Sequence, residues 1–268
     1  MRSSARQRRD AILSELYASK EVTASLMAAA LDVSEATVRR DLRALAEEGQ
    51  IVLNYGGATL PNHVDFSYRS KAMRNVEAKR IVGELAGGLI AEGDQVFVDS
   101  GTTCAQLAGH LKRKRSLSVI VNSARLALEL DSPNLQVILL GGEYRPDRMD
   151  NVGPLANTTL SELHGYHAFI SADGLSREVG LMASDVESAY IFRLAVANAK
   201  ATTLLADHTK FHANALCKIV GWDRVARVVT DRKPDEEWTG FFEERNIEVI
   251  YPDKSSDEPK KESTDFTD

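Results

Sequence analysis

The segment 23–57 constrains the fold of this chain more than any other, because patterns typical of a helix, a turn, a second helix and a hairpin follow one another within it. Ser34 is a good helix N-cap, since its hydroxyl can accept a hydrogen bond from an unpaired first-turn amide. Val38, Leu42 and Leu45 follow at i, i+4 and i+7, which predicts one apolar stripe facing a small core. The other face of this helix is then free for a partner.

The face of this helix opposite the apolar stripe carries arginines. At about 100° per residue, Arg40 and Arg43 project away from the apolar stripe, and Arg39 flanks it. Thr37 lies near the N-terminal end, where a recognition helix meets the edges of DNA bases. Arginines are also common on an ordinary solvated helix face, so the neighbouring elements decide between the two interpretations.

The residues on either side complete a helix-turn-helix unit. Apolar residues recur at helical spacing within 6–19, and Thr23 can cap a helix over 24–31 whose small residues allow close packing. The β-rich run 51–55 ends at a glycine pair, which is typical of a hairpin. Three helices and a hairpin predict a winged helix-turn-helix. Its expected DNA-binding residues are Thr23, Ser34, Thr37, Arg39, Arg40 and Arg43.

Charge limits how this unit can bind double-stranded DNA. Residues 1–60 hold eight Lys/Arg and eight Asp/Glu, so the segment has no net positive charge. Binding must then rest on local arginine clusters, one on the second helix and one in the N-terminal arm with Arg2, Arg6, Arg8 and Arg9. We expect modest affinity for each copy, and symmetric pairing of copies on a symmetric operator.

Length and composition predict a second domain. The chain has 268 residues, about two hundred more than one small DNA-binding unit needs. Its net charge of −6 lies entirely in 61–268, which suits a sensor held away from DNA.

No apolar run is long enough to span a membrane, so we expect a cytoplasmic protein. Neither the distant cysteines Cys104 and Cys217 nor the pair His208 and His212 predicts a disulfide, metal or cofactor site.

Four segments are expected along the chain. They are a DNA-binding domain at 1–60, a linker at 61–74, a sensor domain at 75–252 and a disordered tail at 253–268. The tail is charged and almost devoid of apolar residues.

Strand and helix patterns alternate in the second domain. The expected strands are 95–98, 117–121, 135–140, 167–171, 201–205, 225–230 and 247–251, and the expected helices include 75–91, 104–111 and 236–245. Short apolar strands separated by helices predict an α/β domain whose sheet is mostly parallel and covered on both faces.

Polar loops follow these strands at their carboxyl ends, where ligands bind in such folds. In the run Asp-Ser-Gly-Thr-Thr at 99–103, glycine permits close backbone approach and the hydroxyls can donate, which is typical of a phosphate cradle. Such a turn can also serve for helix capping only. The candidate ligand residues in these loops are Asp99, Ser100, Gly101, Thr102, Thr103, Asn122, Gly141, Gly142, Asp173 and Gly174.

Two further candidates lie beyond these loops. Lys210 follows a strand and could meet a phosphate or a carboxylate. Glu187 begins a helix, where an acidic residue is also favoured simply by the helix dipole.

The run Val-Ser-Glu-Ala-Thr-Val-Arg-Arg-Asp-Leu at 33–42, followed by Tyr-Gly-Gly-Ala at 55–58, resembles the DNA-binding module of the DeoR family of bacterial transcription regulators. The loops of the second domain match the sensor half of that family in the same order. The resemblance covers nearly everything from residue 6 to residue 251. The chain departs from the family at Leu53 and Tyr55, where the wing commonly carries arginine and histidine, and at Ser171, where glycine is frequent.

The resemblance implies a sensor domain similar in fold to ribose-5-phosphate isomerase and a phosphorylated sugar as effector, which releases the protein from operator DNA. By the same resemblance, the segment 100–103 holds the phosphate, and Asp99, Asn122, Asp173 and Lys210 meet sugar hydroxyls or neighbouring charges. Homodimers or homotetramers are also implied.

Two functions from different classes remain at this point. The first is a regulator, a repressor of a carbohydrate-catabolism operon. The second is a sugar-phosphate isomerase with an accessory DNA-binding domain, in which Asp173 is the acid near the sugar and Glu187 the base. The segment 180–183 lacks the lysine and the extra glycines that such isomerases carry after their Asp-Gly motif, which favours the regulator.

Overall fold

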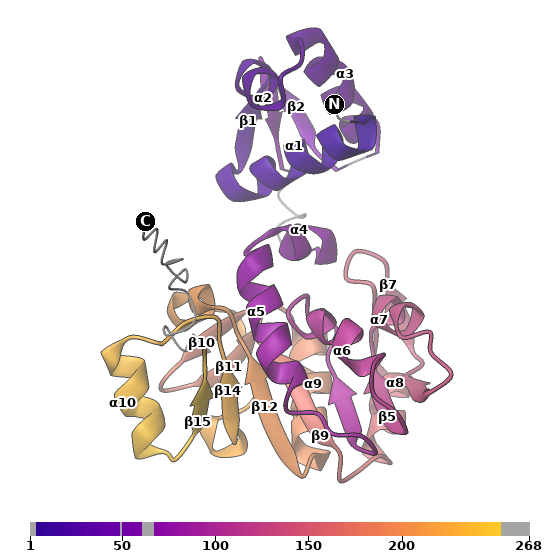
Figure 1. Ribbon diagram of the computed structural model, residues 1–268, viewed down its shortest axis with the longest axis vertical. Coiled ribbons are helices and arrows are strands. Elements are labelled where there is room, and N and C mark those ends of the chain that lie inside the picture. Colours follow the sequence, from indigo (N-terminus) through magenta and orange to yellow (C-terminus); the bar gives the residue numbers. More distant parts are fainter. Residues whose placement is uncertain (1–3, 49, 61–66, 253–268) are drawn as a thin grey trace, which may run out of the picture.

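The computed structural model describes residues 4–48, 50–60 and 67–252, which form two lobes on either side of a short helix (Figure 1). The elements of the upper lobe are α1 (Ala5–Ser19), β1 (Glu21–Thr23), α2 (Ala24–Leu31), α3 (Glu35–Glu47), β2 (Val52–Asn54) and β3 (Gly57–Thr59). The strands pair antiparallel in the order β1-β3-β2. The predicted winged helix-turn-helix is confirmed, with one further strand, β1, ahead of α2.

The helices of this lobe begin at the predicted caps. Ser34 Oγ accepts a hydrogen bond from the amide of Thr37 at 3.3 Å, and Thr23 Oγ1 accepts one from the amide of Leu26 at 3.3 Å. Apolar side chains from all three helices form one core, which contains Ile12, Leu16, Met27, Val38, Leu42 and Leu45.

The lower lobe is an α/β domain built on seven parallel strands in the order β15-β14-β12-β9-β4-β5-β6. These strands are β4 (Gln95–Val98), β5 (Leu117–Val121), β6 (Leu135–Leu139), β9 (His167–Ser171), β12 (Ala201–Leu205), β14 (Arg227–Val229) and β15 (Glu248–Ile250). They coincide with the seven predicted strands to within two residues at each end, so the expected parallel sheet is confirmed.

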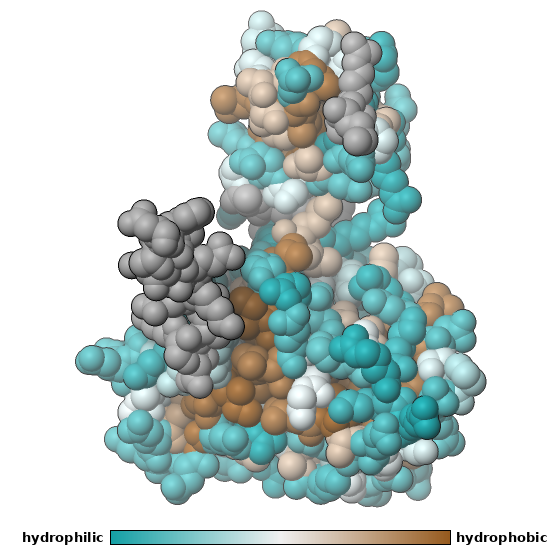
Figure 2. Space-filling view, in the orientation of Figure 1, coloured by the Kyte–Doolittle hydropathy of each residue, from teal (hydrophilic) through white to brown (hydrophobic). Residues whose placement is uncertain are grey.

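Helices cover both faces of the sheet. One face carries α5 (Val76–Gly87), η2 (Cys104–Leu107), α6 (Ala108–Leu111) and α7 (Ala124–Glu129), and the other carries α8 (Pro154–Ser161), α9 (Val186–Asn198) and α10 (Glu236–Glu244). Figure 2 shows an apolar area on the first of these faces, over the strands beside α5.

Small antiparallel pieces extend beyond the carboxyl ends of the sheet. They are the pair β7 (Glu143–Arg145) and β8 (Asp150–Val152), and the sheet of β10 (Gly174–Ser176), β11 (Gly180–Ala183) and β13 (Cys217–Lys218). Two single turns, η3 (His208–His212) and η4 (Trp222–Arg224), complete the lobe. None of these pieces was predicted from the sequence.

The expected linker at 61–74 needs a correction. Residues 68–73 form the helix α4 (Tyr68–Met73), which begins where Ser67 Oγ accepts a hydrogen bond from the amide of Ser70 at 3.2 Å. The rest of the expected linker, 61–66, and the expected tail, 253–268, lie outside the described residues. In the described part of the chain, no helix combines the length and hydropathy needed to cross a membrane.

Candidate functional site

The exposed face of α3 carries unpaired cations. Arg40 and Arg43 are exposed and form no hydrogen bond or ion pair with any other residue that the structure describes. Arg39 is engaged with Glu35 one turn earlier, at 3.0 Å. Two guanidinium groups are therefore free to donate to a nucleic acid from the helix that the sequence singles out.

The arginines of α1 are placed differently from the expectation. The guanidinium of Arg8 donates to the buried carboxylate of Asp41 on α3 at 2.8 Å, and Arg9 donates to Glu48 at 3.3 Å. Arg8 and Arg9 therefore tie α1 to α3, whereas the sequence suggested that they belong to a free DNA-binding arm. Arg6 is exposed, and Arg2 lies outside the described residues. These acidic residues thus neutralise Arg8 and Arg9 and leave Arg40 and Arg43 of α3 available.

The wing presents apolar and aromatic side chains instead of cations. Val52 and Leu53 are about half exposed, and Tyr55 at the turn between β2 and β3 is fully exposed. Asn54 is the polar side chain of this strand. The caps Thr23 and Ser34 are exposed at the starts of α2 and α3.

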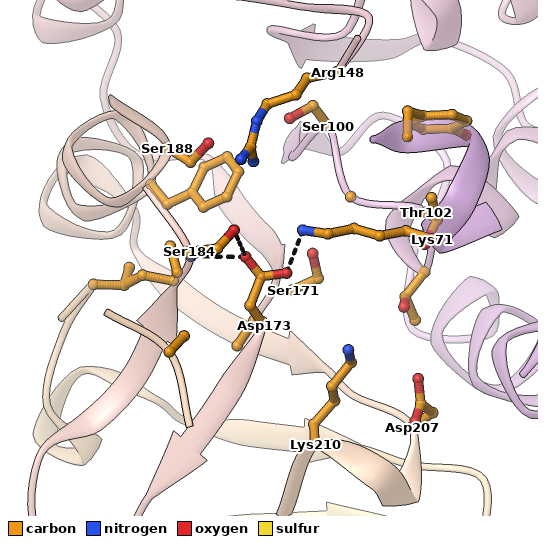
Figure 3. Close-up of a pocket in the computed structure, with 18 of the residues that line it drawn as sticks. Lys71, Ser100, Thr102, Arg148, Ser171, Asp173, Ser184, Ser188, Asp207 and Lys210 are labelled. Carbon is orange, nitrogen blue, oxygen red and sulfur yellow. Dashed lines mark hydrogen bonds and ion pairs between the residues drawn. The ribbon is translucent and has the colours of Figure 1, made fainter. Parts of the chain in front are cut away.

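A pocket of about 750 Å³ opens at the carboxyl ends of β4, β9 and β12, under α4 and the start of α5 (Figure 3). Six of the predicted ligand residues line it, which are Ser100, Gly101, Thr102, Thr103, Asp173 and Lys210. The topology brings these loops together because the carboxyl ends of parallel strands share one edge of the sheet.

The loop after β4 is held from below by Asp99. This buried carboxylate accepts from the amide of Ser171 at 2.5 Å and from the amide of Gly101 at 2.7 Å. Burial raises the pKa of Asp99, and those hydrogen bonds counter the rise. Thr102 and Thr103 are buried beside the pocket, and their backbone amides have no acceptor among the described residues. The loop therefore offers donors of the kind that cradle a phosphate.

Several cations line the same pocket as this loop. The pocket is lined by Lys71, Arg74, Lys79, Arg148 and Lys210. The Lys210 ammonium has no hydrogen-bond or ion-pair partner in the described chain. Lys79 is buried, and its Nζ donates to the carbonyl oxygens of Lys71 and Arg74, the latter at 2.6 Å. Burial lowers the pKa of Lys79 to about 8, against the opposing effect of the nearby Asp207 carboxylate.

One ion pair crosses the pocket. Lys71 Nζ on α4 lies 2.5 Å from Asp173 Oδ1, and the other oxygen of Asp173 accepts from the amide and hydroxyl of Ser184 at 2.8 and 2.6 Å (Figure 3). Burial alone would raise the pKa of Asp173, but Lys71 and Ser184 outweigh it and lower that pKa to about 2. Asp173 is therefore ionised at any physiological pH.

The hairpin β7–β8 stabilises the wall of the pocket that contains Ser100 and Arg148. Arg145 donates to Asp150 at 2.9 and 2.7 Å and to Asp185 at 2.7 Å, and Arg148 lies 2.8 Å from Asp185. Asp150 in turn accepts from the hydroxyl of Ser100 at 3.1 Å. This network fixes the position of Ser100, and it neutralises Asp150 so that the wall does not repel an anion.

The remaining predicted ligand residues lie outside the pocket lining. Asp99 is beneath the loop, and Asn122 is buried with its amide donating to the carbonyl of Asn151 at 3.3 Å. Glu187 is exposed on α9, where its neighbour Ser188 turns into the pocket instead. The glycines permit close backbone packing at two of their positions: a Cβ on Gly142 would lie 2.4 Å from the Val152 oxygen, and one on Gly174 would lie 2.2 Å from the Ala213 oxygen. Gly141 is exposed and has no close neighbour.

Several pocket residues were missed from the sequence. Lys71 and Arg74 fall in the segment expected as a linker, and Lys79 falls in the first turns of an ordinary amphipathic helix. Asp207 precedes the predicted Lys210, and its Oδ2 is buried without a partner in the described chain. One sequence feature could have revealed them: three cations fall within 69–74 and a fourth at residue 79, a density that is unusual for a linker.

Two family models and several curated relatives match this chain. The DeoR C terminal sensor domain model matches residues 74–232, and the DeoR-like helix-turn-helix domain model matches residues 8–64. The HTH-type transcriptional repressor CsqR of Escherichia coli (strain K12) is 31% identical over 84% of this chain and 87% of its own length. The lactose phosphotransferase system repressor of Lactococcus lactis subsp. lactis is 35% identical over 77% of this chain and 83% of its own length.

Solved structures with a similar arrangement include ribose 5-phosphate isomerase A from Methanocaldococcus jannaschii, at a TM-score of 0.38 and 19% identity, over 51% of this chain and 54% of that one. The two family models together span both lobes, from the helix with the free arginines to the pocket. The chain therefore belongs to the DeoR family of transcription regulators.

Proposed function

We propose that this protein represses an operon for carbohydrate catabolism and that a phosphorylated sugar or sugar derivative releases it from its operator DNA. The observation that carries the proposal is one pocket that is lined both by Thr102 and Thr103, whose amides are unpaired in the described chain, and by several cations. A relative at 35% identity is a repressor of a lactose phosphotransferase system, which supports a role in sugar metabolism.

The chemistry of the pocket divides between two parts of such a ligand. A phosphate is accommodated by the loop 100–103, with Lys71 and Lys210 supplying charge-assisted hydrogen bonds. Sugar hydroxyls find acceptors and donors further along the pocket, where Asp207 and Ser184 line the wall. Ionised and neutral groups are therefore arranged for a molecule with one anionic end and one polyol end.

On the DNA side, α3 would lie in the major groove with Arg40 and Arg43 toward base edges. The lobe has no net charge, so two copies on a symmetric operator are proposed to share the site. The apolar area beside α5 in Figure 2 is a surface that such pairing could cover.

The structure does not favour the isomerase alternative, because Glu187, the residue suggested as its base, does not line the pocket. Glu187 is exposed on the outer side of α9 and does not line the pocket, whereas a general base must reach the proton it abstracts. The relatives compared above are named as transcriptional repressors. We therefore propose no catalytic activity.

The test of the proposal is a thermal-shift screen of the full-length protein against hexose phosphates, pentose phosphates and the matching free sugars. A ligand that binds the native state raises the melting temperature by mass action. At least one sugar phosphate is expected to raise it by several degrees, and its unphosphorylated counterpart is not. If no phosphorylated sugar changed the melting temperature, the assigned ligand class would be wrong.

Affinity for that sugar phosphate is expected to fall as pH rises through about 8. The pKa of Lys79 is about 8, so its charge is present below that pH and is lost above it, while the sugar phosphate stays dianionic. A loss of about ten-fold between pH 7.5 and pH 9.5 is expected, because the attraction between the Lys79 charge in the pocket lining and the phosphate is lost. Calorimetric titration checks this, with Lys79→Met as the variant that lacks the slope. Equal wild-type affinity at both pH values would contradict it.

A further inference from the structure

The helix α4 is the element through which the two lobes meet. On the DNA-binding side, α4 packs against α1, and Met73 packs on the core of the upper lobe. On the sensor side, the amide of Tyr68 donates to the carbonyl of Asp147 at 2.8 Å, and the guanidinium of Arg125 lies 4.9 Å from the centre of the Tyr68 ring. A displacement of α4 would therefore move α1, and α1 is tied to α3 by the Arg8–Asp41 ion pair.

The same helix is held in place by groups that line the effector pocket. Lys71 on α4 pairs with Asp173 across the pocket, and Lys79 on α5 donates to the carbonyls of Lys71 and Arg74 at the end of α4. Of these contacts, the Lys71–Asp173 pair is the one that a bound anion competes with directly, because it joins two lining side chains of opposite charge. Both side chains are about one quarter exposed, so the pair is reachable from the pocket.

We propose that the Lys71–Asp173 ion pair is a latch that holds α4, and through α4 the DNA-binding lobe, in the operator-binding arrangement, and that the effector's phosphate opens it by taking Lys71 from Asp173. This deepens the proposed function and rests on it. The phosphate is a stronger ligand for the ammonium than a single carboxylate, and it repels Asp173 at the same time. Once the pair is broken, α4 loses its link to Asp173, the residue that directly precedes β10, and the constraint on α1 is relaxed.

Linkage gives the latch two consequences. If the broken pair favours effector binding, then breaking the pair by mutation must favour the effector-bound arrangement as well. A variant without the latch should therefore bind DNA poorly in the absence of effector. It should also bind phosphate more tightly, because Lys71 no longer has to leave a partner.

Asp173→Asn tests this in the full-length protein. The asparagine oxygen can still accept from Ser184, so the loop keeps its hydrogen bonds while the charge that holds Lys71 is gone. The DNA is a duplex selected from a random library by the wild-type protein, and the anion is inorganic phosphate. We expect DNA affinity without phosphate to fall at least five-fold, the lower end of typical allosteric coupling, and phosphate affinity to rise.

Two further variants separate the latch from simpler explanations. Glu237→Gln makes the same change in net charge by breaking an exposed pair with Arg177 at 2.8 Å, remote from α4, and should leave DNA binding as in the wild type. Lys71→Met opens the latch from the other side, so it should weaken DNA binding like Asp173→Asn but weaken phosphate binding instead of strengthening it.

The deciding readout is DNA affinity without phosphate. Tighter phosphate binding does not decide the question, because removing a negative charge near the anion site would strengthen phosphate binding even without a latch. Hydrogen exchange of the amides of α4 is the second measurement, and it should be faster in Asp173→Asn than in the wild type and unaffected by added phosphate. Wild-type DNA affinity and wild-type exchange in that variant would overturn the latch. The proposed function would survive that result, because it fails only if sugar phosphates leave the wild-type protein unaffected.

Discussion

Replacing Arg40 and Arg43 together by alanine is expected to weaken operator binding by about 2–6 kcal/mol, or more than about thirty-fold. Both guanidinium groups are exposed on α3 without partners in the described chain, so removing them leaves no buried charge behind. Each bidentate contact from an arginine to a guanine contributes about 1–3 kcal/mol of discrimination. Fluorescence anisotropy with a selected duplex and a scrambled duplex, at one fixed salt concentration, measures the loss.

The matched control is Arg115→Ala. Arg115 is also exposed, but it precedes β5 at the amino ends of the strands, on the sensor domain. It should change operator affinity only slightly, through the net charge. If the double variant kept the affinity and the sequence preference of the parent protein, α3 would not be the recognition helix.

Gly101→Ala is expected to lower effector affinity by about 10–100-fold while DNA binding without effector is retained. A Cβ at this position would lie 1.9 Å from Ser171 Oγ and 2.9 Å from Asp99 Oδ1, so the loop must move. A shifted loop no longer aims the amides of Thr102 and Thr103 at the phosphate. Each hydrogen bond to a charged group contributes about 1.5–3 kcal/mol, which sets the expected range.

The clash between the new methyl group at residue 101 and Ser171 Oγ can be removed by a second substitution. Ser171→Gly deletes the hydroxyl that meets the new methyl group, while the amide of residue 171 can still donate to Asp99. The double variant should therefore recover a large part of the affinity that Gly101→Ala loses. Calorimetric titration of both variants checks this, and wild-type affinity in the single variant would remove the loop from the phosphate site.

Local patterns predicted most of the architecture. The start of α3 follows from the Ser34 hydroxyl, and its buried face follows from the spacing of Val38, Leu42 and Leu45. The seven strands are short apolar runs between helices, and burial on both faces of a parallel sheet demands that composition. By contrast, α4 has only six residues, and it is stabilised by tertiary contacts such as the Tyr68 amide to the Asp147 carbonyl, which leave no local pattern.

The site was predictable to the extent that it is local. The loop 99–103 was found because glycine, hydroxyls and a following helix act together within five residues. Lys71 and Lys79 could not be found in this way, because they reach the pocket only when α4 and α5 fold over the sheet. At Glu187 the helix geometry mattered: successive helical residues are separated by about 100°, so its neighbour Ser188 lines the pocket while Glu187 is exposed.

The central claim is that occupancy of the pocket loosens the grip of α3 on DNA. The most direct measurement is to titrate the sugar phosphate found in the thermal-shift screen into the complex of wild-type protein with its selected duplex, and to follow anisotropy at constant ionic strength. Release of the duplex is expected at a concentration that matches direct binding, and at a much higher concentration for Gly101→Ala. A ligand that saturates the pocket and leaves the complex intact would contradict the account.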